Sequence, residues 1–142
     1  MLQVRHLLER KGSDVFAIES GAPVLEAIKR MAERGVGALL VMDDTRLVGI
    51  VSERDYARKI ILQGRASATT AVRDIMSSHV LTVSPEASVD ECMRLCTDSR
   101  VRHLPVTDEQ RVVGVVSIGD LVKAVISEQA EQLAQLQRYI AS

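Results

Sequence analysis

The feature that most constrains this chain is an internal repeat at a fixed offset of 65 residues. When residues 24–60 are placed on residues 89–125 without a gap, 12 of the 37 pairs are identical. Unrelated segments of ordinary composition would share about two or three. Residues 4–8 also resemble residues 72–76, with a further shift of three. We therefore predict two copies of one unit, at 1–63 and 71–127, joined by a linker at 64–70 and followed by a helical tail at 128–142.

Each copy reads as strand, helix, strand, strand, helix. In the second copy, residues 81–83 predict a short strand, and Ser88 with Glu91 forms a capping-box pattern that starts a helix. In the first copy, Pro23 marks the start of the matching helix and Gly35 its end. Two apolar runs follow in each copy, at 38–42 and 47–51 and at 104–106 and 112–116. Such continuous runs predict strands that are covered on both faces.

The last helix of each copy is predicted to start at Ser52 or Ser117. Apolar residues recur at helical spacing after each serine, so one face of each helix should be buried. The tail continues this periodicity more weakly at Ala130, Leu133, Gln137 and Ile140, which predicts an extension of the last helix with a partly buried stripe. The expected buried positions are Tyr56, Ala57, Ile60 and Ile61 in the first copy and Leu121, Val122, Val125 and Ile126 in the second.

Composition excludes several classes of protein. No apolar run approaches the ~20 residues that cross a bilayer, and the N-terminus lacks the apolar core of a signal peptide, so we expect a cytoplasmic protein. Net charge is −1 and aromatic residues make up 2%, which argues against a nucleic-acid-binding surface. Cys92 and Cys96 lie one helical turn apart and are expected to be core residues. A redox role for them stays open, whereas the additional ligands that a metal site requires are missing nearby.

Four motifs carry a resemblance to a known family. They are Gly49-Ile-Val-Ser-Glu-Arg-Asp55, its counterpart Gly114-Val-Val-Ser-Ile-Gly-Asp120, and the segments 100–106 and 72–76. Together they resemble a tandem pair of cystathionine-β-synthase (CBS) domains, of the kind found in stand-alone bacterial CBS-pair proteins. The resemblance implies a mixed α/β (α+β) fold, with two pseudo-twofold-related β-α-β-β-α repeats packed sheet to sheet and a C-terminal helical extension. It also implies a regulatory protein that binds adenine nucleotides in clefts between the repeats.

The two Ser-x-x-Asp motifs allow two interpretations. Ser at a helix start with an acid three residues later is a capping box, and this role alone would explain both motifs. A helix N-terminus also attracts phosphate, and a carboxylate in the first turn can accept hydrogen bonds from the vicinal hydroxyls of a ribose. The resemblance assigns the ribose to Asp55 and Asp120 and the phosphate to Ser52 and Ser117.

The resemblance also assigns basic and apolar contacts. Arg102, His103 and Arg54 match family positions that face phosphate, although each could equally be a solvated surface charge. The copies differ here, because the first lacks counterparts of Arg102 and His103 and the second lacks one of Arg54. We therefore expect unequal sites, with the tighter one at Asp120. The adenine-pocket candidates, each of which could be an ordinary core residue, are Val15, Phe16, Ile18, Leu81, Thr82, Val101 and Pro105.

These features predict a regulatory module rather than an enzyme, because no catalytic triad, metal cluster or phosphate-binding glycine loop stands out. AMP is the first expected ligand, followed by NAD(H) and then ATP or ADP, and no further cofactor is required. The expected partners are a second copy of the chain and an unidentified protein target, without nucleic acid or membrane. Two alternatives stay open: a structural CBS-like protein that has lost ligand binding, and a redox-linked regulator.

Overall fold

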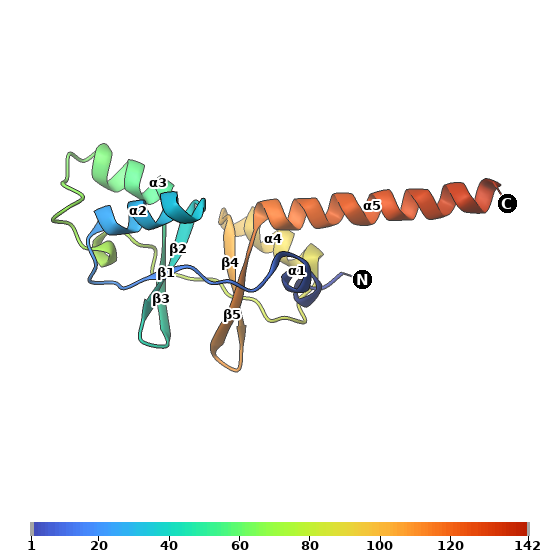
Figure 1. Ribbon diagram of the computed structural model, residues 1–142, viewed down its shortest axis with the longest axis horizontal. Coiled ribbons are helices and arrows are strands. Elements are labelled where there is room, and N and C mark those ends of the chain that lie inside the picture. The colour runs from blue at the N-terminus through green and yellow to red at the C-terminus, as the bar shows by residue number, and fades with distance from the viewer. Residues whose placement is uncertain (1, 142) are drawn as a thin grey trace. The chain divides into compact units, whose positions relative to one another are not determined.

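The order helix, strand, strand, helix occurs twice along the chain, as α2-β2-β3-α3 and as α4-β4-β5-α5 (Figure 1). The structure is a computed structural model that describes residues 2–141. These residues form two units. Residues 14–81 are called the central unit here, and residues 2–13 with 82–141 are called the terminal unit.

The central unit is built on a three-stranded sheet. Its strands are β1 (Ala17–Ile18), β2 (Ala38–Asp43) and β3 (Arg46–Ser52), in the order β1-β2-β3, with β1 parallel and β3 antiparallel to β2. Gly35 ends helix α2 (Val24–Arg34) in the left-handed conformation, with φ +65°, which confirms the predicted stop. The remaining elements are α3 (Glu53–Tyr56), the π-helical turn η1 (Ala57–Ile61) and the 3-10 turn η2 (Val72–Asp74).

The terminal unit repeats this plan around a two-stranded antiparallel sheet, β4 (His103–Asp108) and β5 (Arg111–Ser117). Its helices are α1 (Val4–Lys11), α4 (Val89–Ser99) and α5 (Ile118–Ala141). The Ser88 side chain accepts a hydrogen bond of 3.1 Å from the Glu91 amide, which confirms the predicted start of α4. Helix α5 continues without a break through residue 141, so the predicted helical extension is also confirmed.

The strand predicted at 81–83 is wrong. Val83 makes a single parallel bridge to Val106, while Leu81 and Thr82 are exposed and lie outside any strand. Pro85 follows closely and has no amide hydrogen to donate to a ladder. Its carbonyl instead accepts from the Arg5 amide, so the chain leaves the sheet at this point.

Equivalent positions of the two repeats fill the two cores. The cores share the pairs Val24/Val89, Ala27/Cys92, Met31/Cys96, Leu39/Leu104, Val41/Val106 and Val51/Val116, and all twelve residues are buried. The first segment of each sequence repeat, however, packs in the unit formed mainly by the other repeat. Val4 and Leu7 of α1 lie in the terminal core, whereas Val72 and Ile75 lie in the central core.

Two equivalent glycines make this exchange possible. A Cβ at Gly114 would lie 2.7 Å from the Leu8 side chain, and one at Gly49 would lie 2.6 Å from the Met76 sulfur. Both distances are shorter than van der Waals contact. A side chain at Gly114 would require Leu8 to move, and one at Gly49 would also meet the Ser77 carbonyl oxygen, 2.8 Å away, so backbone would have to shift there. The glycines in the two motifs therefore have a packing role of their own.

The predicted stripes of the last helices are only partly correct. Ile60 and Leu121 are buried, but Ala57 is exposed and Ile61, Val122 and Ile126 are 59%, 40% and 61% exposed. In the first copy the π-helical turn changes the number of residues per turn and moves the stripe off the core. In the second copy Ala124, rather than Val122, joins Leu121 against the core.

The tail stripe is not partly buried as expected. Leu133 and Ile140 are exposed, and so are the other two predicted positions, Ala130 and Gln137. The predicted linker, in contrast, is well ordered against its own unit. The carbonyls of Ser67 and Thr70 accept hydrogen bonds of 3.0 and 2.8 Å from the first amides of α2. Among the helices within residues 2–141, none combines the length and apolar character needed to cross a membrane.

Candidate functional site

Both Ser-x-x-Asp motifs form a helix cap. The Ser52 amide donates to Asp55 Oδ2 at 2.9 Å, and the Asp55 amide donates to Ser52 Oγ at 3.2 Å. The Ser117 amide donates to Asp120 Oδ2 at 2.8 Å, and the Asp120 amide donates to Ser117 Oγ at 3.1 Å. The capping interpretation is thus confirmed at both positions, and each carboxylate is held against the first turn of its helix.

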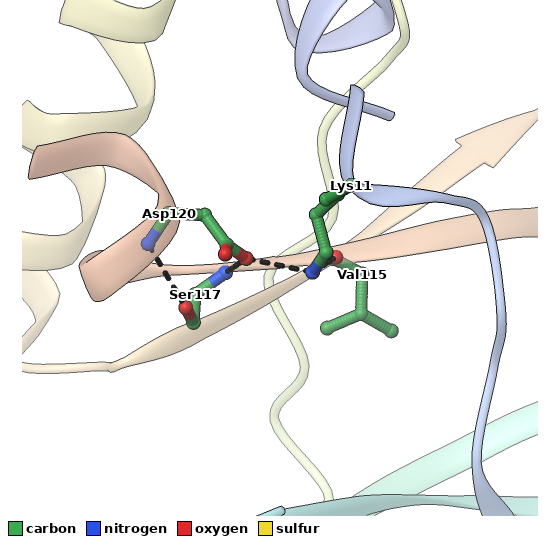
Figure 2. Close-up of polar contacts among 4 residues, drawn as sticks. All are labelled: Lys11, Val115, Ser117 and Asp120. Atoms are coloured by element: carbon green, nitrogen blue, oxygen red, sulfur yellow. Dashed lines mark hydrogen bonds and ion pairs between the residues drawn. The ribbon is translucent and has the colours of Figure 1, made fainter. Parts of the chain in front are cut away.

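Lys11, at the end of α1, reaches the second of these caps. Its Nζ lies 2.7 Å from Asp120 Oδ2 and 2.8 Å from the Val115 carbonyl oxygen (Figure 2). The side chains of Lys11 and Asp120 remain 37% and 27% exposed. Within residues 2–141, Asp120 Oδ1 receives no hydrogen bond. The carboxylate is therefore fixed through one oxygen and can accept hydrogen bonds through the other.

The residues around Asp120 form an electrostatic cluster. Burial raises the pKa of Asp120, but hydrogen bonds from Lys11 and Ser117 outweigh it, and the pKa lies below its ordinary value. His103 stands opposite Ser117 in the β4–β5 pair. Burial lowers the pKa of His103, with Lys11 and Arg102 acting in the same direction and Asp120 opposing them. Arg102 is exposed, and its carbonyl accepts a 2.8 Å hydrogen bond from the Ile118 amide at the start of α5.

A small basic pocket opens beside this cluster, between α1 and α5. Its volume is roughly 160 Å³, below the about 300–1,000 Å³ of pockets that enclose a whole drug-sized ligand. It can thus hold a phosphate or a sugar, but not a complete nucleotide. Its lining residues are Leu7, Arg10, Lys11, Asp120, Lys123, Ala124 and Ser127.

Sequence reasoning missed the cations of this pocket. Arg10 and Lys11 are visible in the sequence as the basic end of an amphipathic segment, and Lys123 follows the second Asp motif. Nothing in the pattern, however, connects Lys11 with a residue 109 positions away. Only the packing of α1 in the terminal unit brings the two together.

The equivalent cap in the central unit makes a longer ion pair with its nearest lysine. Lys59 Nζ lies 3.7 Å from Asp55 Oδ1 and donates a hydrogen bond of 2.9 Å to the Ile75 carbonyl. Ala38 takes the place of His103 opposite Ser52, as the sequence alignment predicts. Arg54 is exposed on α3, in the same unit as Asp55.

The adenine-pocket candidates are divided between the units. Ile18 is a core residue with 3% exposure, and Pro105 is buried within β4, so the side chains of both serve packing. Phe16 is half-buried, and the Arg34 guanidinium lies 5.2 Å from the centre of its ring. Val15 and Val101 are half-buried, and Leu81 and Thr82 are exposed. Val15, Phe16, Ile18 and Leu81 belong to the central unit, and Thr82, Val101 and Pro105 belong to the terminal unit.

The two cysteines are free and buried in α4. Burial raises the pKa of Cys92 to about 11 and also raises the pKa of Cys96. Because the thiolate is the reactive form, both thiols are poor nucleophiles at neutral pH. Over residues 2–141, no group of three or more His, Cys, Asp or Glu side chains is placed to hold a metal ion.

Comparison with known proteins adds a family match. The family model described as CBS domain matches residues 4–62 and 72–127. CBS domain-containing protein CBSX3, mitochondrial, from Arabidopsis thaliana is 48% identical over 122 residues, which cover 82% of this chain and 59% of that protein. The chain therefore spans little more than half the length of that curated relative.

Two solved structures are similar to most of the chain. A Burkholderia ambifaria protein with CBS domains, named as a candidate signal-transduction protein, is 49% identical, with a TM-score of 0.87 and coverage of 89% of this chain and 96% of that one. The CBS domain pair of protein MJ0100, solved with 5′-methylthioadenosine and S-adenosyl-L-methionine, has a TM-score of 0.80 and 24% identity. Coverage in that comparison is 90% of this chain and 98% of that one. At this identity the second likeness concerns the fold alone.

Proposed function

Because this chain belongs to the CBS domain family, we propose that it is a regulatory module that binds an adenine nucleotide and signals its presence to a partner protein. The observation that carries the proposal is the carboxylate of Asp120. It is fixed at the start of α5, has one oxygen open, and stands beside a pocket that contains three basic side chains.

The groups around Asp120 can contact both the sugar and the phosphate of a nucleotide. The open oxygen of Asp120 is suited to accept hydrogen bonds from ribose hydroxyls. Lys11, Arg10 and Lys123 are suited to a phosphate, as are Ser117 and the amides at the N-terminus of the long helix α5. His103, the first residue of β4, and Arg102, which precedes it, lie beside this helix start. The small volume suits the single sugar and single phosphate of AMP, which we therefore place first. NAD(H) and then ATP or ADP are the next candidates.

Related proteins support this class of ligand. The MJ0100 domain pair was crystallised with two adenosine derivatives, so the fold is compatible with adenosine recognition. The Burkholderia relative supports a signalling role rather than catalysis. We extend both inferences to this chain, with a second copy and a protein target as partners and the cytoplasm as the compartment.

The two alternatives have less support. A redox-linked regulator would require an accessible, acidic thiol, and both cysteines are buried with raised pKa values. A protein that has lost ligand binding could retain both carboxylates as helix caps, but it would not need the basic pocket beside the open oxygen of Asp120.

The deciding experiment identifies the ligand directly. Mass spectrometry of the gently purified protein should detect a bound adenine nucleotide. After its removal, AMP, ADP, ATP and NAD(H) should each be tested in thermal unfolding. A ligand at 100 times its Kd stabilises the fold by about 2.7 kcal/mol, which raises the Tm by about 5–15 °C for a chain of this size. Absence of a shift with every nucleotide at millimolar concentration would refute the proposal.

A further inference from the structure

Helix α5 presents an exposed apolar stripe that its own unit does not cover. The stripe positions are separated by four, three, four, three and four residues, so they repeat every 3.5 residues, as the core positions of a coiled coil do. The five apolar members are 40–73% exposed. In order, the stripe residues are Val122, Ile126, Gln129, Leu133, Leu136 and Ile140.

The opposite face of α5 already has its partners. Leu121 and Ala124 belong to the terminal core, and they lie on the side of the helix away from most of the stripe. Figure 1 shows α5 continuing well past the helices α1 and α4 of its unit. The family match ends at residue 127, so the second half of the stripe belongs to a segment beyond the family fold. At 1.5 Å per residue the stripe is about 27 Å long.

We propose that the stripe binds the same stripe of a second copy of this chain, in a parallel, in-register two-helix coiled coil. In heptad terms Ile126, Leu133 and Ile140 occupy the a positions, and Val122, Gln129 and Leu136 occupy the d positions. A copy in parallel register brings each of these residues opposite itself. Five of the six layers then pair an apolar side chain with its copy, and the sixth pairs Gln129 with Gln129.

Gln129 selects the orientation. In the parallel register its amide lies opposite the amide of the other Gln129, and the two groups can hydrogen-bond, as a single buried polar core residue does in other coiled coils. In the antiparallel register the same amide would face Leu133. A buried amide without a partner is costly, so the parallel pair is favoured.

The distribution of charged residues around the stripe is compatible with pairing to a second copy. The positions that flank the stripe between 125 and 139 hold Val, Ala, Gln, Gln and Tyr, and none of them is charged. The charged residues of this segment, Glu128, Glu131 and Arg138, fall at c and f positions on the outer face. Lys123, which flanks the first turn of the stripe, lines the pocket beside Asp120. From residue 125 on, two copies therefore meet without like-charge repulsion.

Disulfide trapping in the full-length chain tests this geometry. Leu136→Cys places a thiol at a d position, opposite itself in the parallel pair, and Gln135→Cys places one on the outer face as the matched control. Both variants are oxidised with glutathione disulfide, without nucleotide, at about 50 µM protein, where a contact of micromolar Kd is populated. Circular dichroism checks that each variant is folded, and the wild-type chain controls for Cys92 and Cys96.

We expect covalent dimer to form at least about tenfold faster in Leu136→Cys than in Gln135→Cys. Adding Leu133→Glu to Leu136→Cys should abolish this advantage, whereas adding the outer-face charge Gln135→Glu should preserve it. Equal rates for the two cysteine variants would overturn the proposal, as would an advantage that survives Leu133→Glu in folded protein. An antiparallel pair or a different helical partner would also leave Leu136→Cys uncrosslinked, and either result would overturn it.

Discussion

The two Ser-x-x-Asp turns are alike in sequence and local structure, yet their surroundings differ. Each carboxylate accepts a hydrogen bond from the backbone amide of the serine three residues earlier. Asp55 has Lys59, from the π-helical turn that follows, at 3.7 Å, whereas Asp120 has Lys11, from a distant helix, at 2.7 Å. Asp55 lies in a four-residue α-helix that leads into this π-helical turn, whereas Asp120 lies in the first turn of a helix of 24 residues.

This difference shows where the repeat symmetry ends. Capping depends on residues three apart, so both copies retain it. The field at each carboxylate depends on which segment packs beside it and on the length of the following helix, because aligned peptide dipoles add along a regular helix. The terminal unit supplies a lysine at 2.7 Å and a long helix, whereas the central unit supplies a lysine at 3.7 Å and a short helix. We therefore expect the site at Asp120 to dominate nucleotide binding.

The largest expected effect comes from exchanging each carboxylate for an amide. Asp120→Asn retains an oxygen for the helix cap but removes the charged acceptor that would hold the ribose. Hydrogen bonds to a charged group are worth about 1.5–3 kcal/mol each, so the loss of two should weaken AMP binding at least about a hundredfold. Asp55→Asn is the matched control and should cost less. Calorimetric titration with AMP measures both.

The converse result would reverse the assignment of the main site. If Asp55→Asn abolishes AMP binding and Asp120→Asn leaves it intact, the main nucleotide site lies at Asp55 and not at Asp120. Equal, small losses in both variants would favour capping as the whole role of the motif.

A smaller effect is expected from Lys11. Its ammonium occupies Asp120 Oδ2, so a sugar that requires both carboxylate oxygens must displace it. A partly exposed ion pair is worth about 0.2–1 kcal/mol. Lys11→Met should therefore tighten binding of adenosine about two- to fivefold. AMP should gain less, because its phosphate loses a nearby cation.

Lys59→Met provides the matched control for Lys11→Met. Its carboxylate partner lies farther away, so adenosine binding should change less than in the Lys11 variant. Titration of adenosine and AMP against both variants separates the cases. A weaker adenosine interaction in Lys11→Met would mean that Lys11 supports the sugar rather than competing with it.

Much of the fold could be predicted from the sequence because it depends on local sequence patterns that occur in both repeats. The mixed α/β repeats, the caps at Ser88 and Ser117 and the stop at Gly35 follow from residues within one turn of each other. The errors fall where packing overrides pattern. Leu81 and Thr82 have strand-like composition but no neighbouring strand, and the π-helical turn moves Ile61 out of the core.

The candidate site was predictable only in part, for the same reason. The capping geometry of Asp55 and Asp120 is local, and it was identified. Lys11 belongs to the opposite end of the sequence and reaches Asp120 only because α1 packs in the terminal unit. The predicted tail stripe, which shares Leu133 and Ile140 with the exposed stripe of α5, is exposed rather than partly buried, because periodicity reveals a face but not what covers it.

The smallest expected effect is a pH dependence that only one copy should have. His103 lies beside Asp120, Lys11 and Arg102, and burial lowers its pKa in the folded state, whereas Ala38 at the equivalent position cannot titrate. Below the unfolded pKa of about 6.5, the unfolded chain binds this proton more readily than the folded one, so stability falls as pH falls. His103→Ala, which makes the terminal unit resemble the central one, should lose less stability on acidification. Urea unfolding of both proteins at about pH 7.5 and pH 5.5 measures the difference. A wild-type protein that gains stability relative to His103→Ala at the lower pH would show that Asp120 dominates His103, and the sign argued here would be reversed.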